Sequence, residues 1–180
     1  MNRNTHKIFY GLKSGVIALL LMCCFSFQSE KLNDQTAKAL FVYHFTKYVE
    51  WPIEKRDSKF VIGIFGKTDI LNDLMKITSN KLVDKKEISI ETISDPEKVN
   101  ACNIVYIPND NIEELKNIAK QTKNNGVLIV TETVDACTKG SIINIIKKNS
   151  RMVFEINTAA ATEAKLKVSD QLLALAIVIK

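Results

Sequence analysis

The chain contains the stretch Phe60-Val61-Ile62-Gly63-Ile64-Phe65-Gly66, a short apolar run that ends in a glycine. A run of this length, closed by a turn residue, is typical of a strand that is buried on both faces. Two later runs, at 103–107 and 127–130, have the same character. Strands covered on both faces occur in parallel sheets that have helices on each side. These runs therefore predict an α/β domain with a mostly parallel sheet flanked by helices.

Helical periodicity separates the apolar runs. Apolar side chains recur every three or four positions in 36–50, 70–77 and 112–119, which predicts three amphipathic helices. The first should stop before Pro52, because the residue before a proline avoids the helical region. For the third, Asp110 and Glu113 predict a capping box, and Gly126 is expected at the C-terminal cap.

The pattern changes toward the C-terminus. The segments 141–146 and 152–156 are predicted strands with only five residues between them. So short a link fits an antiparallel hairpin and not a parallel crossover. Two helices are then expected at 158–165 and 170–179, the second capped by Ser169. Because 172–179 is apolar all round, we expect that last helix to be buried.

Residues 1–26 are predicted to be a secretory signal peptide. Arg3, Lys7 and Lys13 precede the apolar run 16–25, and no acidic residue accompanies them. The run is too short for a membrane-spanning helix, which needs about 20 residues. The expected cleavage follows Ser26, which leaves a single domain at 27–180 in the periplasm.

Two rival interpretations of the N-terminus stay open. One is a lipoprotein attached through Cys23 or Cys24, although Met22 is a poor neighbour for such a site. The other is an anchor that is not cleaved. Either way the basic residues of this segment account for most of the net charge of +5, because 27–180 holds 22 lysines and arginines against 20 acids. Nothing in that balance indicates nucleic-acid binding, which needs clustered basic residues.

The motif search yields no catalytic residue, metal site or cofactor. Residues 63–68 resemble a phosphate-binding loop, but Val61 stands where the motif needs a glycine. A bare anion site at the following helix N-terminus stays open. His44 is the only histidine after residue 26, and no cluster of cysteines or acids accompanies it, so a structural role is expected.

Three further residues have two interpretations each. Cys102 and Cys137 could form a disulfide, which export would permit, or could remain buried or free thiols. A bridge needs Cα atoms within about 7 Å, whereas these residues are expected near opposite ends of neighbouring parallel strands. Trp51 is the only tryptophan; it is either an anchor at the edge of the core or an exposed recognition residue.

The sequence resembles the YfiR-like family of exported bacterial proteins. Its opening signature is similar to the stretch Ala39-Leu40-Phe41-Val42-Tyr43-His44-Phe45-Thr46-Lys47-Tyr48-Val49-Glu50-Trp51-Pro52. Later landmarks follow in the family's order at 60–66, 102–107, 126–130 and 151–157. The resemblance extends over essentially all of 27–180, and it depends on the order and spacing of these blocks.

This resemblance implies a non-enzymatic periplasmic regulator. The best-known member restrains an inner-membrane diguanylate cyclase through its periplasmic part, which lowers cyclic di-GMP and biofilm formation, and members tend to form homodimers. The implied partner is a diguanylate cyclase or sensor kinase with a periplasmic domain, so membrane contact is expected only through that partner. Trp51, Phe154 and Glu155 are family motif positions and candidate partner-binding residues. The chain departs from the pattern at His44, where asparagine is frequent, at 139–140, where a glycine pair is frequent, and in having fewer cysteines than members with two disulfides.

A second hypothesis comes from the fold class. Parallel α/β sheets bind ligands in a crevice at the carboxyl ends of their strands. A small-molecule or envelope-fragment binding site near Gly66 or Pro108 is therefore the alternative function. An enzyme is the third hypothesis, and it would require a cluster that the sequence does not reveal.

Overall fold

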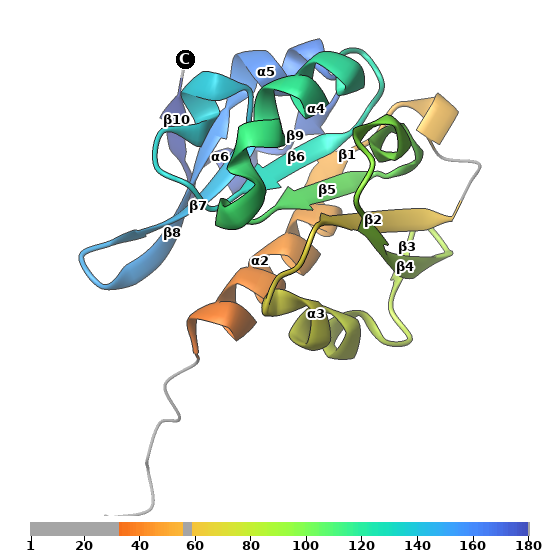
Figure 1. The fold of residues 1–180 in the computed structure, drawn as a ribbon, viewed down its shortest axis with the longest axis horizontal. Coiled ribbons are helices and arrows are strands. Elements are labelled where there is room, and N and C mark those ends of the chain that lie inside the picture. Colours follow the sequence, from red (N-terminus) through yellow and green to blue (C-terminus); the bar gives the residue numbers. More distant parts are fainter. Residues whose placement is uncertain (1–32, 56–58, 180) are drawn as a thin grey trace, which may run out of the picture. The chain divides into compact units, whose positions relative to one another are not determined.

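The computed structural model describes residues 33–55 and 59–179 (Figure 1). The signal peptide predicted at 1–26 lies outside the described residues. The described part of the chain is built around an eight-stranded sheet with the order β10-β8-β7-β6-β5-β2-β4-β3. Its strands are β2 (Phe60–Phe65), β3 (Leu82–Val83), β4 (Lys86–Ile93), β5 (Ile104–Ile107), β6 (Leu128–Thr131), β7 (Ile143–Lys148), β8 (Arg151–Asn157) and β10 (Ile177–Ile179).

The direction of the strands confirms the predicted fold class. Strands β4, β2, β5, β6 and β7 are all parallel to their neighbours in this series. The β7–β8 pair is antiparallel and forms the hairpin that the five-residue link predicted. At the two edges, β3 pairs antiparallel with β4, and β10 pairs parallel with β8.

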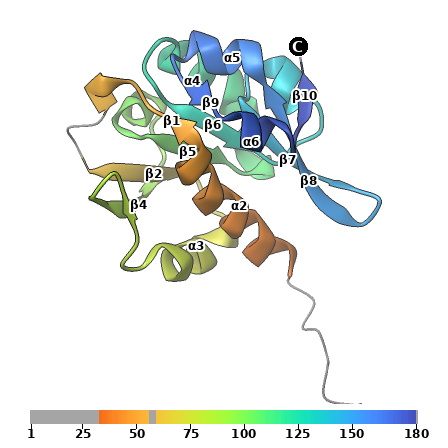
Figure 2. The same ribbon diagram turned by 180° about the vertical axis from the view of Figure 1, so that it is seen from behind.

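Helices cover both faces of the sheet (Figures 1 and 2). The helices α2 (Asp34–Tyr48) and α3 (Ile70–Thr78) lie on one face, and α4 (Leu115–Thr122) and α5 (Thr158–Glu163) lie on the other. Short 3-10 turns connect the larger elements: η1 (Ile53–Lys55), η2 (Pro96–Ala101), η3 (Asn109–Glu114) and η4 (Ala136–Lys139). A separate two-stranded sheet joins β1 (Val49–Glu50) to β9 (Lys167–Val168), so the chain that leaves α2 is tied to the segment after α5.

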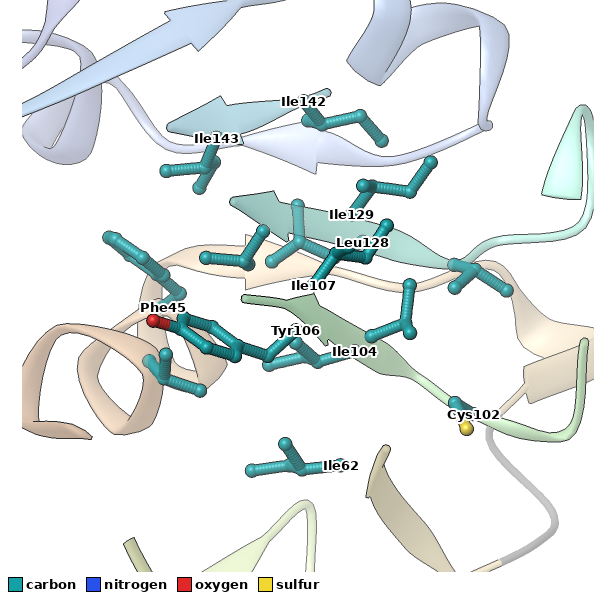
Figure 3. Close-up of a cluster of buried hydrophobic side chains, with 14 of the residues drawn as sticks. Phe45, Ile62, Cys102, Ile104, Tyr106, Ile107, Leu128, Ile129, Ile142 and Ile143 are labelled. Carbon is teal, nitrogen blue, oxygen red and sulfur yellow. The ribbon is translucent and has the colours of Figure 1, made fainter. Parts of the chain in front are cut away.

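The core follows the apolar runs of the sequence. Every residue of β2, β5 and β6 is buried. Figure 3 shows Tyr106 pointing from β5 toward Phe45 of α2, between the isoleucines and leucine of neighbouring strands. The ring of Phe45 also meets the ring of Phe154 edge-on at 5.4 Å, which ties α2 to β8.

The prediction of a buried helix at 170–179 is wrong. The helix α6 (Asp170–Leu173) ends after four residues, although Ser169 caps it as expected by accepting a hydrogen bond from the amide of Leu172. The chain then continues as β10 along the free edge of β8. Leu175 is 75% exposed and Val178 is 43% exposed, so this segment is not buried.

The caps predicted for the third helix are also wrong. Residues 109–114 form η3, and no side-chain capping hydrogen bond is made at its start. The helix α4 ends at Thr122, with Lys123 as its C-cap. Gly126 instead occupies the turn before β6, with φ +64°. The capping box fails because Asp110 lies inside η3, whereas α4 begins only at Leu115 with Glu114 at its N-cap.

Candidate functional site

A ligand crevice was expected at the carboxyl ends of the parallel strands, and at the end of β2 another side chain fills the space beside Gly66. Gly66 follows β2 in a left-handed conformation with φ +86°, and a Cβ placed on it would lie 2.3 Å from Oδ1 of Asn111. The side chain of Asn111 therefore occupies the space beside Gly66. The amide of Gly66 donates to the carbonyl of Ile93 at 2.8 Å, which extends the pairing of β2 with β4 by one residue.

A polar cluster lies at the same ends of β5 and β6. Lys38 of α2 forms a salt bridge with Glu132, and their side chains are only 18% and 13% exposed. The backbone amide of Asn109 donates to Glu132 Oε1 at 3.2 Å. Tyr106, which is fully buried, contributes a buried hydroxyl to this cluster. Its three side chains come from α2, β5 and the turn after β6, so the cluster fixes α2 on the sheet.

The protonation states follow from burial and charge. Burial raises the pKa of Glu132, but the hydrogen bond from Lys38, the contact with Tyr106 and the charge of Lys38 outweigh it, so the pKa is lowered overall. Burial, followed by the negative charge of Glu132, raises the pKa of Tyr106. The carboxylate is therefore ionised and the phenol neutral near pH 7. Sequence reasoning missed this cluster. One signal was present: Lys38 lies one turn before Phe41 and Val42, so it is on the side of the helix that packs against the sheet.

The candidate partner-binding residues are used within the fold. Trp51 is 6% exposed, donates from Nε1 to the carbonyl of Asn103 at 3.0 Å, and meets the ring of Phe60 edge-on at 4.9 Å. Phe154 is 5% exposed. Glu155 accepts a 2.9 Å hydrogen bond from Asn144, whose Oδ1 accepts from Thr131 at 2.8 Å. Trp51 and Phe154 therefore act as core anchors here.

Cys102 and Cys137 are both free thiols, in different surroundings. Cys102 lies just before β5, with its sulfur against Gly63, whereas Cys137 lies in η4 after β6. Burial, followed by the charge of Glu91, raises the pKa of Cys102 to about 11. Burial, followed by the charge of Glu155, raises the pKa of Cys137 to about 12. Both thiols are therefore protonated and poorly nucleophilic at neutral pH.

The exposed side of the family's opening signature, residues 39–52, carries a row of four side chains that we call the signature strip: Tyr43, His44, Lys47 and Tyr48. His44 is exposed on α2, and its ring lies 5.7 Å from the ring of Tyr43. The ammonium of Lys47 lies 4.8 Å from the centre of the same tyrosine ring. Tyr48 ends the helix and is 36% exposed. His44 is thus a surface residue rather than a core histidine.

A pocket of about 790 Å³ lies beside this strip. We call it the signature pocket, and it is lined by Thr46, Lys47, Val49, Glu50, Trp51, Leu82, Val83, Asp84 and Lys86. It brings the end of α2 next to the β3–β4 turn, although these segments are far apart in sequence. Leu82, which is 58% exposed, gives it an apolar wall, and its charged residues are of both signs. A pocket lined in this way is better suited to contact a protein partner than to bind a single small ion.

Among residues 33–55 and 59–179, no group of three or more histidines, cysteines and acids is placed to hold a metal ion. Within the same part of the chain, no helix is both long enough and apolar enough to cross a bilayer.

These features define a class: an α/β domain with helices on both faces of a mostly parallel sheet. Within that class, the chain belongs to the YfiR/HmsC-like family, whose model matches residues 35–177. The match begins at the start of α2 and ends at the start of β10. It therefore includes the signature strip, the buried cluster and the hairpin.

A solved structure supports the fold. It is described as the crystal structure of a conserved domain protein from Vibrio cholerae O1 biovar El Tor strain N16961. It superposes with a TM-score of 0.51 at 10% sequence identity, over 83% of this chain. At this low identity the likeness concerns the fold alone, and the chain spans 61% of the length of that protein. No curated protein matches the chain.

Proposed function

We propose that the protein is a non-enzymatic periplasmic regulator that binds the extracytoplasmic part of a membrane signalling protein, a diguanylate cyclase or a sensor kinase, and restrains it. Membership of the YfiR/HmsC-like family across residues 35–177 is the observation that supports this function. The predicted signal peptide at 1–26 would place the domain in the compartment of such a partner. A regulator of this kind acts by binding one state of the signalling protein more tightly than the other.

The signature strip and the signature pocket form our candidate docking surface. Tyrosine and other aromatic residues are enriched among the residues that dominate binding energy. Here Tyr43 and Tyr48 are accompanied by the exposed Leu82 and by lysines and acids that give a polar rim. The buried Trp51 lines the pocket, so its contribution to a partner would come through the shape of this surface.

The test is capture of the partner from the envelope. The tagged protein is crosslinked in its own host, solubilised in mild detergent, and read by mass spectrometry. We expect enrichment of a membrane cyclase or kinase with a periplasmic domain, and loss of signalling control when the gene is deleted. Leu82→Asp should abolish the enrichment. Val134→Asp is the matched control, since Val134 is also an exposed apolar residue, at 73%, but lies in a distant turn.

Two outcomes would contradict the proposal. A crosslinked preparation that contains no membrane signalling protein would remove the regulatory function. Equal enrichment with Leu82→Asp and the unmodified chain would retain the function but place the docking surface elsewhere. Sedimentation of the purified protein separately tests whether the regulator acts as a homodimer.

A further inference from the structure

A second pocket, of about 420 Å³, lies at the amino ends of the parallel strands. We call it the lysine–asparagine pocket, and it is lined by Pro52, Lys55, Asn100, Asn124, Asn125 and Lys165. Lys55 precedes β2, Asn100 precedes β5, and the two neighbouring asparagines precede β6. Since these strands are parallel, the three turns meet at the amino ends of the strands, whereas Gly66 lies at their carboxyl ends. Lys165 reaches the same amino ends from the turn after α5.

Hydrogen bonds between the turns fix the shape of this pocket. The ammonium of Lys55 donates to the carbonyl of Asn100 and, at 3.0 Å, to the carbonyl of Cys102. The amide nitrogen of Asn125 donates to Oδ1 of Asn100 at 3.0 Å. The turn with Lys165 is joined to the turn after α4 by backbone bonds from Asn124 to Glu163 and from Gly126 to Ala164, at 3.2 and 3.0 Å. The lining is thus already ordered, which lowers the cost of binding a ligand.

The charge of the lining is unbalanced. Its described residues include two lysines and no acid. Among the described residues, neither Lys55 nor Lys165 takes part in a salt bridge. Lys55 is half-buried, and its burial lowers its pKa, which a nearby anion would oppose. The side chain of Asn124 makes no hydrogen bond to the described residues, and Asn100 Nδ2 makes none either, so amide groups are available beside the two ammonium groups.

We propose that the lysine–asparagine pocket binds a small polyhydroxylated anion, such as an acidic sugar. The two ammonium groups would hold the carboxylate, and the asparagine amides would exchange hydrogen bonds with hydroxyl groups. The volume falls in the range of small-molecule sites, roughly 300–1,000 Å³. This site differs in place and in chemistry from the signature pocket, so it does not depend on the proposed regulatory function.

The test is isothermal titration of the full chain with D-glucuronate, with D-glucose and inorganic phosphate as comparisons. Glucuronate should bind at least about tenfold more tightly than glucose, because only glucuronate places a charge near the lysines. It should also bind more tightly than phosphate, which lacks the sugar hydroxyls. Raising the salt concentration should weaken glucuronate binding, since Lys165 is exposed and its charge is screened.

Two substitutions locate the site. Asn124→Asp places a carboxylate in the pocket without a change of size, and aspartate tolerates the left-handed conformation at φ +61°. It should weaken glucuronate binding about tenfold or more. Asn149→Asp is the matched control, since Asn149 is also exposed and has φ +50°, but lies in the β7–β8 turn. Lys165→Gln should likewise weaken binding, whereas Lys85→Gln, another exposed lysine with positive φ, should not.

Three results would overturn the proposal. The first is that neither anion binds at millimolar concentration. The second is that glucose or phosphate binds as tightly as glucuronate. Equal binding of glucose would show that the charge does not contribute, and equal binding of phosphate would show that the sugar hydroxyl groups do not. The third is that Asn124→Asp and Asn149→Asp behave alike, which would place any binding outside this pocket.

Discussion

The two ends of the parallel strands differ in whether their lysines lie beside acidic side chains. At the carboxyl ends, Lys38 is matched by Glu132, and Asn111 occupies the space beside Gly66. At the amino ends, Lys55 and Lys165 line a pocket whose described residues include no acid. Most parallel α/β proteins place their ligand at the carboxyl ends. Here that end holds the helix α2 in place, and the unmatched charge lies at the opposite end, so fold class alone does not locate a binding site.

The largest effect is expected from Gly66→Ala. The new Cβ would meet Asn111 at 2.3 Å while the backbone stays at φ +86°. Overpacking together with a left-handed alanine should cost about 3 kcal/mol of unfolding free energy. Urea denaturation measures this value. The double variant Gly66→Ala/Asn111→Ala should recover part of the loss, and no recovery would show that Asn111 does not fill that space.

A smaller loss is expected from Lys38→Met, which leaves Glu132 among buried groups without its cation. Because both side chains retain some exposure, we expect a loss of about 2 kcal/mol, below the usual cost of breaking a fully buried pair. Chemical denaturation of the two single variants and of Lys38→Met/Glu132→Gln gives the coupling. If the losses of unfolding free energy in the two single variants simply add in the double variant, Lys38 and Glu132 are not coupled, and this pair does not hold the carboxyl ends together.

The pH dependence of the unfolding free energy should show the contribution of Glu132 at the carboxyl ends. The folded-state pKa of Glu132 is lowered, so its ionised form adds stability above the unfolded-state pKa and loses it as the pH falls through the folded-state pKa. Between pH 7 and pH 3, Glu132→Gln should therefore lose less unfolding free energy than the unmodified chain. Glu113→Gln, at an exposed position, should follow the unmodified chain. A parallel decline in all three would show that Glu132 is not involved.

The smallest effect is expected at the open end. Asn124→Asp changes an exposed side chain that makes no hydrogen bond to the described residues, so its unfolding free energy should stay within about 0.5 kcal/mol. Thermal unfolding at neutral pH measures this. A loss as large as that of Lys38→Met would mean that the lysine–asparagine pocket is a structural feature like the opposite end.

The outcome at individual elements shows where sequence reasoning succeeds. The strands β2, β5 and β6 were predictable because each is a continuous apolar run that must be covered on both faces. The hairpin was predictable because five residues cannot form a parallel crossover. Residues 172–179 misled because a short apolar run fits a buried helix or a strand equally well by periodicity. The free edge of β8 offered backbone hydrogen bonds that no local pattern contains.

The candidate sites show the complementary limit. Lys55, Asn100 and Lys165 are ordinary polar residues in separate turns, and only the parallel arrangement of the strands brings them to one edge. Trp51 and Phe154 stood out as motif residues, yet their side chains are buried in the fold. A polar side chain acquires its function from neighbours that are distant in sequence, which a linear pattern does not show.

Local sequence was sufficient for the α/β class, for the hairpin and for the family signature, because burial and turn length act over a few neighbouring residues. The assembled chain alone determined which end of the sheet is closed, which lysine has an acidic partner, and how the C-terminus pairs. Those features depend on distances between segments up to a hundred residues apart, and such distances exist only after the sheet has formed.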